Sequence, residues 1–179
     1  DLDGKIHIVY GGMVTPSHVS AKRFGDTQCH HLVETITKQG IYFDIYLSPN
    51  YNQFRTKQLF GDYLLRARTN FFFNFKRGLP LDEAPKEFSR YDFGAMAYLF
   101  DRGASLEGQN RTRLSTKLFT YLEAGLPIIV SEEFQYAAKL VKEHEIGIVV
   151  SQKDLDNLPD VINRYDIGKL RTNVKKAQK

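Results

Sequence analysis

The chain has 179 residues, of which 42% are hydrophobic and 26% charged, and this balance excludes an intrinsically disordered protein. A chain of this length supports one domain with a sizeable core rather than two. The net charge of +4 is compatible with phosphate-bearing ligands or an anionic membrane surface, but it is too small for a dedicated nucleic-acid-binding protein. No apolar run approaches the ~20 residues that a membrane-spanning helix needs.

Cysteine usage and the amino-terminal residues bear on the cellular compartment. The single cysteine, Cys29, excludes a disulfide framework and is typical of a reducing environment. No signal peptide is recognisable, so we expect a cytoplasmic protein. Basic residues gather near the carboxyl end, and we interpret them as a solvated helix face. Peripheral contact with the inner face of a membrane stays open as an alternative.

The tripeptide Cys29-His30-His31 is the strongest metal-ligating pattern in the chain. It falls within a segment of helical periodicity, where three consecutive side chains point in different directions. They cannot close around one ion, so we predict no metal site.

The first half of the chain alternates short apolar runs with segments of helical periodicity. Strands are predicted over 6–10, 41–47, 70–75 and 92–100, and helices over 27–38, 51–68 and 82–90. The third strand contains four phenylalanines in six residues, which is typical of a central strand in a buried sheet. Lys76 and Arg77 follow this strand and are interpreted as solvated.

The second half opens with a polar segment over 101–113, which is longer than most connections and is therefore a candidate functional loop. A helix is predicted over 116–124, with Leu118, Phe119 and Leu122 facing the core and Gly125 at the C-cap. The later elements alternate again: strands from Pro127 and over 147–150, helices over 134–143 and from 154 onward, with a break at Pro159.

Regular alternation of strands and helices predicts an α/β fold. Right-handed crossovers then give a Rossmann-like three-layer sandwich, in which helices cover both faces of a parallel sheet. We find no internal repeat and no linker rich in glycine or serine, so residues 1–179 are expected to form a single domain.

Ser115, Thr116 and Lys117 stand where a helix is predicted to begin after a strand. Ligands of open parallel sheets bind beyond the carboxyl ends of the strands, and a helix start offers unpaired N–H groups and the positive end of the helix dipole to a phosphate. Two hydroxyl groups and one ammonium group add further donors. Two interpretations stay open at this point: a diphosphate site, or a plain N-cap at Ser115 with a solvated Lys117.

The segment STKLFTYLEAGLPIIVS, residues 115–131, resembles the stretch P-x-K-L-x-E-Y-L-A-A-G-L-P-V-I of GT-B glycosyltransferases. Three further segments resemble other parts of the same domain, in the same order: KIHIVYGG, FFFNFKRGLPLDEAPKEFSRYDFGAMAY and AAKLVKEHEIGIVV. The resemblance spans residues 5–150. It implies one half of a GT-B fold: the carboxyl-terminal, donor-nucleotide-binding domain of a group 1 or family 4-like enzyme.

The resemblance also implies positions for the donor contacts. Thr116 and Lys117 match the helix start that binds the diphosphate, and Lys117 would supply the electrostatic part of catalysis. The remaining matched positions are Gly11 and Gly12 at the turn near the phosphates, Gly78 and Leu79 at the turn near the nucleobase, and Asn110 and Ser115 beside the donor sugar.

Two positions depart from the family pattern. Met13 stands where many members carry an arginine, so Lys117 or a nearby basic residue such as Arg23 would have to replace that phosphate contact. Thr120 stands where many members carry a glutamate that binds the ribose hydroxyls; Glu123, one helical turn further on, could substitute.

The resemblance implies a UDP- or GDP-sugar as donor, no other cofactor, and transfer to an acceptor hydroxyl on a glycan, a lipid-linked sugar or a protein in polysaccharide or glycoconjugate biosynthesis. It also implies an amino-terminal acceptor domain outside this chain, so this chain alone is expected to be inactive. Two alternatives stay open: half of a UDP-sugar epimerase, and a non-catalytic Rossmann-like interaction domain. The departures at Met13 and Thr120 mildly favour the non-catalytic interaction domain.

Overall fold

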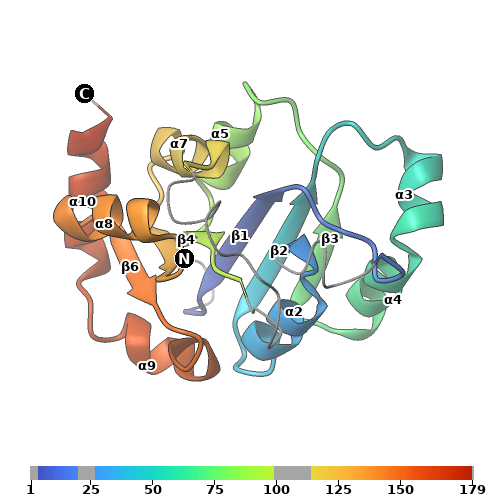
Figure 1. Ribbon diagram of the computed structural model, residues 1–179, viewed down its shortest axis with the longest axis horizontal. Helices are drawn as coiled ribbons and strands as arrows, with labels where there is room; N and C mark the ends of the chain where they lie inside the picture. The colour runs from blue at the N-terminus through green and yellow to red at the C-terminus, as the bar shows by residue number, and fades with distance from the viewer. Residues whose placement is uncertain (1–3, 20–26, 99–113, 179) are drawn as a thin grey trace.

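The computed structural model describes residues 4–19, 27–98 and 114–178 and confirms the predicted α/β architecture (Figure 1). Six parallel strands form one sheet in the order β3-β2-β1-β4-β5-β6. The strands are β1 (His7–Gly12), β2 (Tyr42–Leu47), β3 (Phe73–Lys76), β4 (Phe93–Met96), β5 (Ile128–Ser131) and β6 (Gly147–Val150).

The helices occupy the crossovers between the strands and the carboxyl-terminal part of the chain. They are α2 (His30–Thr37), α3 (Gln53–Leu59), α4 (Gly61–Thr69), α5 (Ala84–Phe88), α7 (Thr116–Glu123), α8 (Gln135–Glu143), the 3-10 helix η2 (Asp154–Asn157), α9 (Leu158–Ile162) and α10 (Ile167–Ala177). Within the described residues, each helix is too short or too polar to cross a bilayer.

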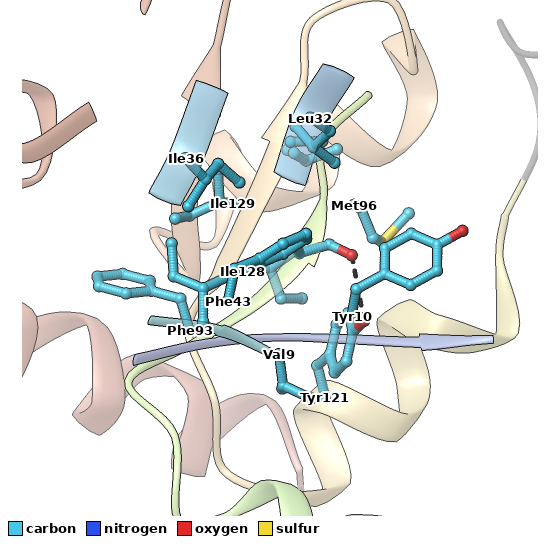
Figure 2. Close-up of a cluster of buried hydrophobic side chains, with 14 of the residues drawn as sticks. Val9, Tyr10, Leu32, Ile36, Phe43, Phe93, Met96, Tyr121, Ile128 and Ile129 are labelled. Atoms are coloured by element: carbon cyan, nitrogen blue, oxygen red, sulfur yellow. Dashed lines mark hydrogen bonds between the residues drawn. The ribbon is translucent and has the colours of Figure 1, made fainter. Parts of the chain in front are cut away.

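Both faces of the sheet are covered because side chains alternate along the buried strands. Leu32 and Ile36 of α2 lie on one side of β1, and Val9 points to the other side, toward Tyr121 of α7 (Figure 2). All four side chains are at most 1% exposed. Helices α8 and α10 pack beside α7, where the three helices line a common groove. The result is the predicted three-layer sandwich.

The order of the strands reverses between β1 and β4. From β1 the chain moves to β2 and then β3 on one side, and from β4 it moves to β5 and then β6 on the other. The two halves of the sheet join through two register pairs, Ile8 with Phe93 and Val9 with Gly94. Such a reversal leaves a crevice at the carboxyl ends of the strands, which is where ligands of this kind of sheet bind.

The phenylalanine-rich strand lies at the edge of the sheet and not at its centre. The prediction of a central strand is therefore wrong, and β3 pairs with β2 alone at one end of the strand order. Phe73 is buried and Phe75 stacks on Tyr63 of α4 with ring centres 5.1 Å apart, whereas Phe71 precedes the strand and is 77% exposed. A run of aromatic residues is therefore equally compatible with an edge strand that a helix covers and with a central strand.

Two local predictions also fail. The helix expected over 51–68 is divided into α3 and α4 at Phe60, whose buried ring packs against Tyr51 and Tyr63. In α7, Tyr121 is buried in place of Phe119, which is 55% exposed. The predicted break at Pro159 is confirmed, because the 3-10 helix η2 ends at Asn157 and Pro159 lies in the first turn of α9, where proline is tolerated; a second break separates α9 from α10.

Two other boundaries agree with the predictions. Gly125 follows α7 with a φ of +73°, a left-handed conformation that ends a helix and favours glycine. Strand β6 covers residues 147–150, as predicted. The candidate loop over 101–113 lies outside the described residues.

The absence of a side chain at Gly94 makes room for the ring of Tyr121, because a Cβ at this position would lie 2.3 Å from Cγ of that ring. We expect Gly94→Ala to lower the free energy of unfolding by about 1–3 kcal/mol through overpacking of the core. Equilibrium unfolding in urea measures the difference.

Gly61→Ala is the matched control. A Cβ at Gly61 meets no atom within 4 Å, and we expect this substitution to be neutral or to stabilise by about 0.4–1 kcal/mol through the unfolded chain. Equal stabilities of the two variants would contradict the proposed fit between Gly94 and Tyr121.

Candidate functional site

A cavity of about 270 Å³ opens at the carboxyl ends of β1 and β2, beside the start of α7. One part of its wall consists of glycines and of polar residues at the start of α7, and the other part is largely apolar. Its lining residues are Gly11, Gly12, Met13, Tyr46, Leu47, Ser48, Pro49, Leu79, Leu81, Ala84, Phe88, Ser115, Thr116, Lys117, Thr120 and Tyr121.

Helix α7 begins at this cavity in the manner that its sequence predicts. Ser115 is the N-cap residue with extended backbone angles (φ −87°, ψ 141°), and its Oγ accepts a hydrogen bond of 3.3 Å from the Lys117 amide. The Thr116 amide has no acceptor among the described residues. The helix start therefore presents a backbone donor and the positive end of its dipole at the cavity.

The side chain of Lys117 crosses the end of β1. Its Nζ donates a hydrogen bond of 2.8 Å to Tyr98 Oη and lies 4.5 Å from the ring centre of Tyr10. No carboxylate among the described residues forms an ion pair with it. Its positive charge therefore has aromatic and hydroxyl neighbours but no neutralising partner in the part of the chain that the structure describes.

Gly11 and Gly12 leave space for side chains of this same chain. A Cβ at Gly11 would lie 2.7 Å from the ring of Phe88, and a Cβ at Gly12 would lie 2.9 Å from Lys117 Cε. Gly12 also has a φ of +138°, which L side chains rarely adopt. The family resemblance implies that these glycines admit phosphates. That role stays a prediction, and the structure adds a second reason for each glycine.

Tyr121 fixes α7 against the sheet. Its hydroxyl accepts a hydrogen bond of 3.0 Å from the Gly11 amide and donates one of 3.1 Å to the Ala95 carbonyl, so one phenol joins β1, β4 and α7. Burial raises the pKa of Tyr121 well above its usual range, and the phenol keeps the proton that it donates. The buried Tyr10 likewise has a raised pKa, chiefly through burial, and donates 2.8 Å to the Met13 carbonyl.

The apolar part of the wall includes the ring of Tyr46, which packs edge-on against Phe88 with ring centres 5.2 Å apart. The Tyr46 hydroxyl donates to Glu87 Oε1 at 2.8 Å and accepts from Lys76 Nζ at 3.2 Å. These bonds hold the hydroxyl in place, and the buried side chain forms part of the cavity wall. A flat apolar surface of this kind suits an aromatic base.

A polar network behind Tyr46 was not foreseen from the sequence. Asp44 is 5% exposed and accepts hydrogen bonds from Asn74 Nδ2 at 2.7 Å and from the Tyr91 hydroxyl at 2.6 Å, and it pairs with Lys76 Nζ at 2.7 Å. Burial by itself would lower the pKa of Lys76, but the hydrogen bond to Asp44, the charge of that carboxylate and the Tyr46 hydroxyl together outweigh this, so the pKa is raised. Lys76 is thus paired, not solvated as predicted. An aspartate within the otherwise apolar run YFDIYL was the available signal.

The structure brings together most of the predicted site residues. Seven of them line the cavity: Gly11, Gly12, Leu79, Ser115, Thr116, Lys117 and Thr120. Thr120 Oγ1 donates to the Thr116 carbonyl at 3.1 Å, which leaves its oxygen lone pairs as acceptors.

Two predicted residues are not brought to the cavity. Gly78 packs against the main chain, where a Cβ would lie 2.1 Å from the Leu47 carbonyl oxygen. Glu123 is exposed at the far end of α7 and is absent from the cavity wall, so it does not take the place of a carboxylate at Thr120. Asn110 and Arg23 lie outside the described residues. Among the described residues, no group of three acidic, histidine or cysteine side chains is arranged to hold a metal ion.

The parallel sheet with a cavity at its strand reversal has a Rossmann-like architecture, of the kind that forms each half of a GT-B fold. The model of the family described as Glucosyltransferase 3-like, C-terminal domain, matches residues 46–179. The chain therefore belongs to that family. No curated protein sequence matches the chain.

Solved structures share the fold at low sequence identity. The alpha,alpha-trehalose 6-phosphate synthase of Burkholderia multivorans is 14% identical, with a TM-score of 0.53 over 97% of this chain and 38% of that one. The E. coli trehalose-6-phosphate protein bound with UDP-2-fluoro glucose is also 14% identical, with a TM-score of 0.53 over 97% and 40%. The Burkholderia xenovorans synthase in complex with glucose-6-phosphate is 14% identical, with a TM-score of 0.54 over 97% of this chain and 39% of that one. The chain thus spans about two fifths of the length of these structures.

The contact between Gly12 and Lys117 predicts that substitutions at the two positions are energetically coupled. We expect Gly12→Ala to destabilise the fold by about 1–3 kcal/mol, because its φ is strained for any L side chain. In a Lys117→Ala background the cost should be smaller by about 0.5 kcal/mol or more, because the new methyl group no longer displaces Lys117. Equilibrium urea unfolding of the four proteins of the cycle measures this coupling.

A second cycle with Lys139→Ala is the control, because Lys139 lies in α8, away from Gly12. Its effect should add to that of Gly12→Ala. Additivity in both cycles would mean that Lys117 does not occupy the space above Gly12.

Proposed function

We propose that this cavity binds the diphosphate of a nucleotide-diphosphate sugar, and that the chain is the donor-binding domain of a glycosyltransferase that moves the sugar to an acceptor hydroxyl. One observation carries the proposal: the start of α7 and the turn at Gly12 meet at one corner of the cavity, and the side chain of Lys117, which also lines the cavity, crosses that turn. Membership of the Glucosyltransferase 3-like family supports it.

Charge drives the chemistry that we propose for this corner. When the sugar leaves, negative charge grows on the nucleoside diphosphate, and fixed donors aimed at that charge lower the barrier. The Thr116 amide, the dipole of α7 and Lys117 supply such donors without a metal ion.

The cavity wall also divides in a way that suits a nucleotide. We place the nucleobase against the apolar part, beside Tyr46, Leu79 and Phe88, and the ribose near the Thr120 hydroxyl. A threonine binds a diol less strongly than a carboxylate does, so we expect modest affinity. We propose a UDP-sugar rather than a GDP-sugar as the donor, because the E. coli protein of the same fold is bound with UDP-2-fluoro glucose.

We propose that the acceptor binds chiefly to an amino-terminal domain, because the chain spans about two fifths of the length of its structural relatives. The acceptor would be a glycan, a lipid-linked sugar or a protein, and the setting would be cytoplasmic polysaccharide or glycoconjugate synthesis. On this proposal the 179-residue chain binds nucleotide but turns nothing over by itself.

Titration of the 179-residue chain with UDP, GDP and uridine tests the donor site. We expect UDP to perturb the amide resonances of Gly12, Thr116 and Lys117, because its diphosphate lies against those groups, and we expect uridine to leave them unchanged. Silence with all three compounds would contradict the proposal and favour a non-catalytic interaction domain.

Lys117→Ala tests the role of the ammonium group. We expect it to weaken UDP binding by about 1.5–3 kcal/mol, the range for hydrogen bonds to charged groups. Isothermal titration calorimetry at constant ionic strength gives the difference. Lys139→Ala, an exposed lysine on α8, removes the same charge away from the cavity and should leave the affinity unchanged. Equal affinities of the two variants would remove Lys117 from the site.

A further inference from the structure

The ammonium group of Lys117 lies in a pocket made by three residues, Tyr10, Gly12 and Tyr98, which we call the lysine seat. The Nζ atom donates a hydrogen bond of 2.8 Å to the Tyr98 hydroxyl and lies 4.5 Å from the centre of the Tyr10 ring. The Cε atom of the same side chain occupies the space left open by Gly12. Both tyrosines are buried, at 0% and 7% exposure, and meet edge to face with ring centres 6.0 Å apart.

Tyr98 is itself held from three directions. Its amide donates to Ser131 Oγ at 3.0 Å, its carbonyl accepts from Gln152 Nε2 at 2.9 Å, and its ring packs on Phe134 with ring centres 5.1 Å apart. These contacts come from β5, from the segment after β6 and from the residue before α8. The Tyr98 hydroxyl therefore has a fixed position, and it is not merely carried along by Lys117.

The geometry leaves part of the ammonium group available. An ammonium group has three N–H donors and no acceptor. One N–H donates to Tyr98 Oη, and the Tyr10 ring attracts the positive charge without consuming it. A carboxylate in place of either tyrosine would compete with an incoming diphosphate, whereas a neutral hydroxyl and a ring orient the lysine and leave its charge to a ligand.

We propose that Tyr98 is a positioning residue for the donor diphosphate and that it acts by holding Lys117 at the end of β1 before the nucleotide arrives. This inference rests on the proposed function. A free lysine side chain samples many rotamers and loses that freedom when it binds. A lysine already held in its seat loses less, so the diphosphate binds more tightly with no additional contact.

Tyr98→Phe tests the proposal, because it deletes the hydroxyl and keeps the buried ring. We expect the affinity of the 179-residue chain for UDP to fall by about three- to tenfold, and the affinity for uridine to stay the same. Calorimetric titration with both compounds separates an effect on the diphosphate from an effect on the whole cavity. A thermal unfolding curve confirms that the variant is folded.

Proton NMR of the unliganded chain supplies a readout that does not depend on binding. The Tyr10 ring should shift the ε-methylene protons of Lys117 upfield, and Tyr98→Phe should reduce that shift as the side chain leaves its seat. Tyr63→Phe is the matched control: it removes another buried hydroxyl, which accepts from the Cys29 amide at 2.9 Å and is not part of the cavity wall. It should change neither the Lys117 resonance nor the preference for UDP over uridine.

The outcomes separate the two ideas. If the wild-type chain does not prefer UDP to uridine, the proposed function fails. If the wild-type chain shows the preference and Tyr98→Phe keeps it undiminished, the positioning role alone fails. Tighter UDP binding by Tyr98→Phe would also overturn the inference, because Tyr98 would then be a latch that the ligand must break.

Discussion

The arrangement of this domain depends on one phenol. The Tyr121 hydroxyl accepts a hydrogen bond from the Gly11 amide and donates one to the Ala95 carbonyl, and the tyrosine ring fills the volume that Gly94 leaves empty. Through these contacts the second half of α7 is tied to the two strands between which the sheet reverses. Because a helix is stiff, fixing one turn also fixes the other, and Ser115, Thr116 and Lys117 are thereby held at the cavity.

The fold was predictable from the sequence because its signals are local. Strand and helix periodicities and the glycine after α7 depend on neighbouring residues and were read correctly in most segments. The failures share one cause, which is tertiary packing. No short-range pattern distinguishes Phe119, which is exposed, from Tyr121, whose ring is accommodated by a glycine 27 residues earlier in the chain. The edge position of β3 likewise follows from the strand order, which no property of its own residues specifies.

The candidate site, too, was predictable only where its signals are local. Its corner was predictable, because a helix start after a parallel strand and a double glycine are visible in the sequence. The surroundings of Lys117 were not, because Tyr10 lies in β1 and Tyr98 follows β4, and the two side chains meet only in the folded chain. Glu123 was misplaced for a geometric reason: one helical turn beyond Thr120 leads along α7 away from the cavity and not deeper into it.

The narrow junction between β1 and β4 has a consequence for how the domain assembles. Two register pairs join halves whose strands come from separate parts of the chain, and the cavity draws its wall from both halves. The first three strands can pair before the rest of the chain is synthesised, but the crevice exists only after β4 has docked on β1. A ligand that contacts both halves binds only when they are docked, so its binding stabilises the docked arrangement against separation of the two halves.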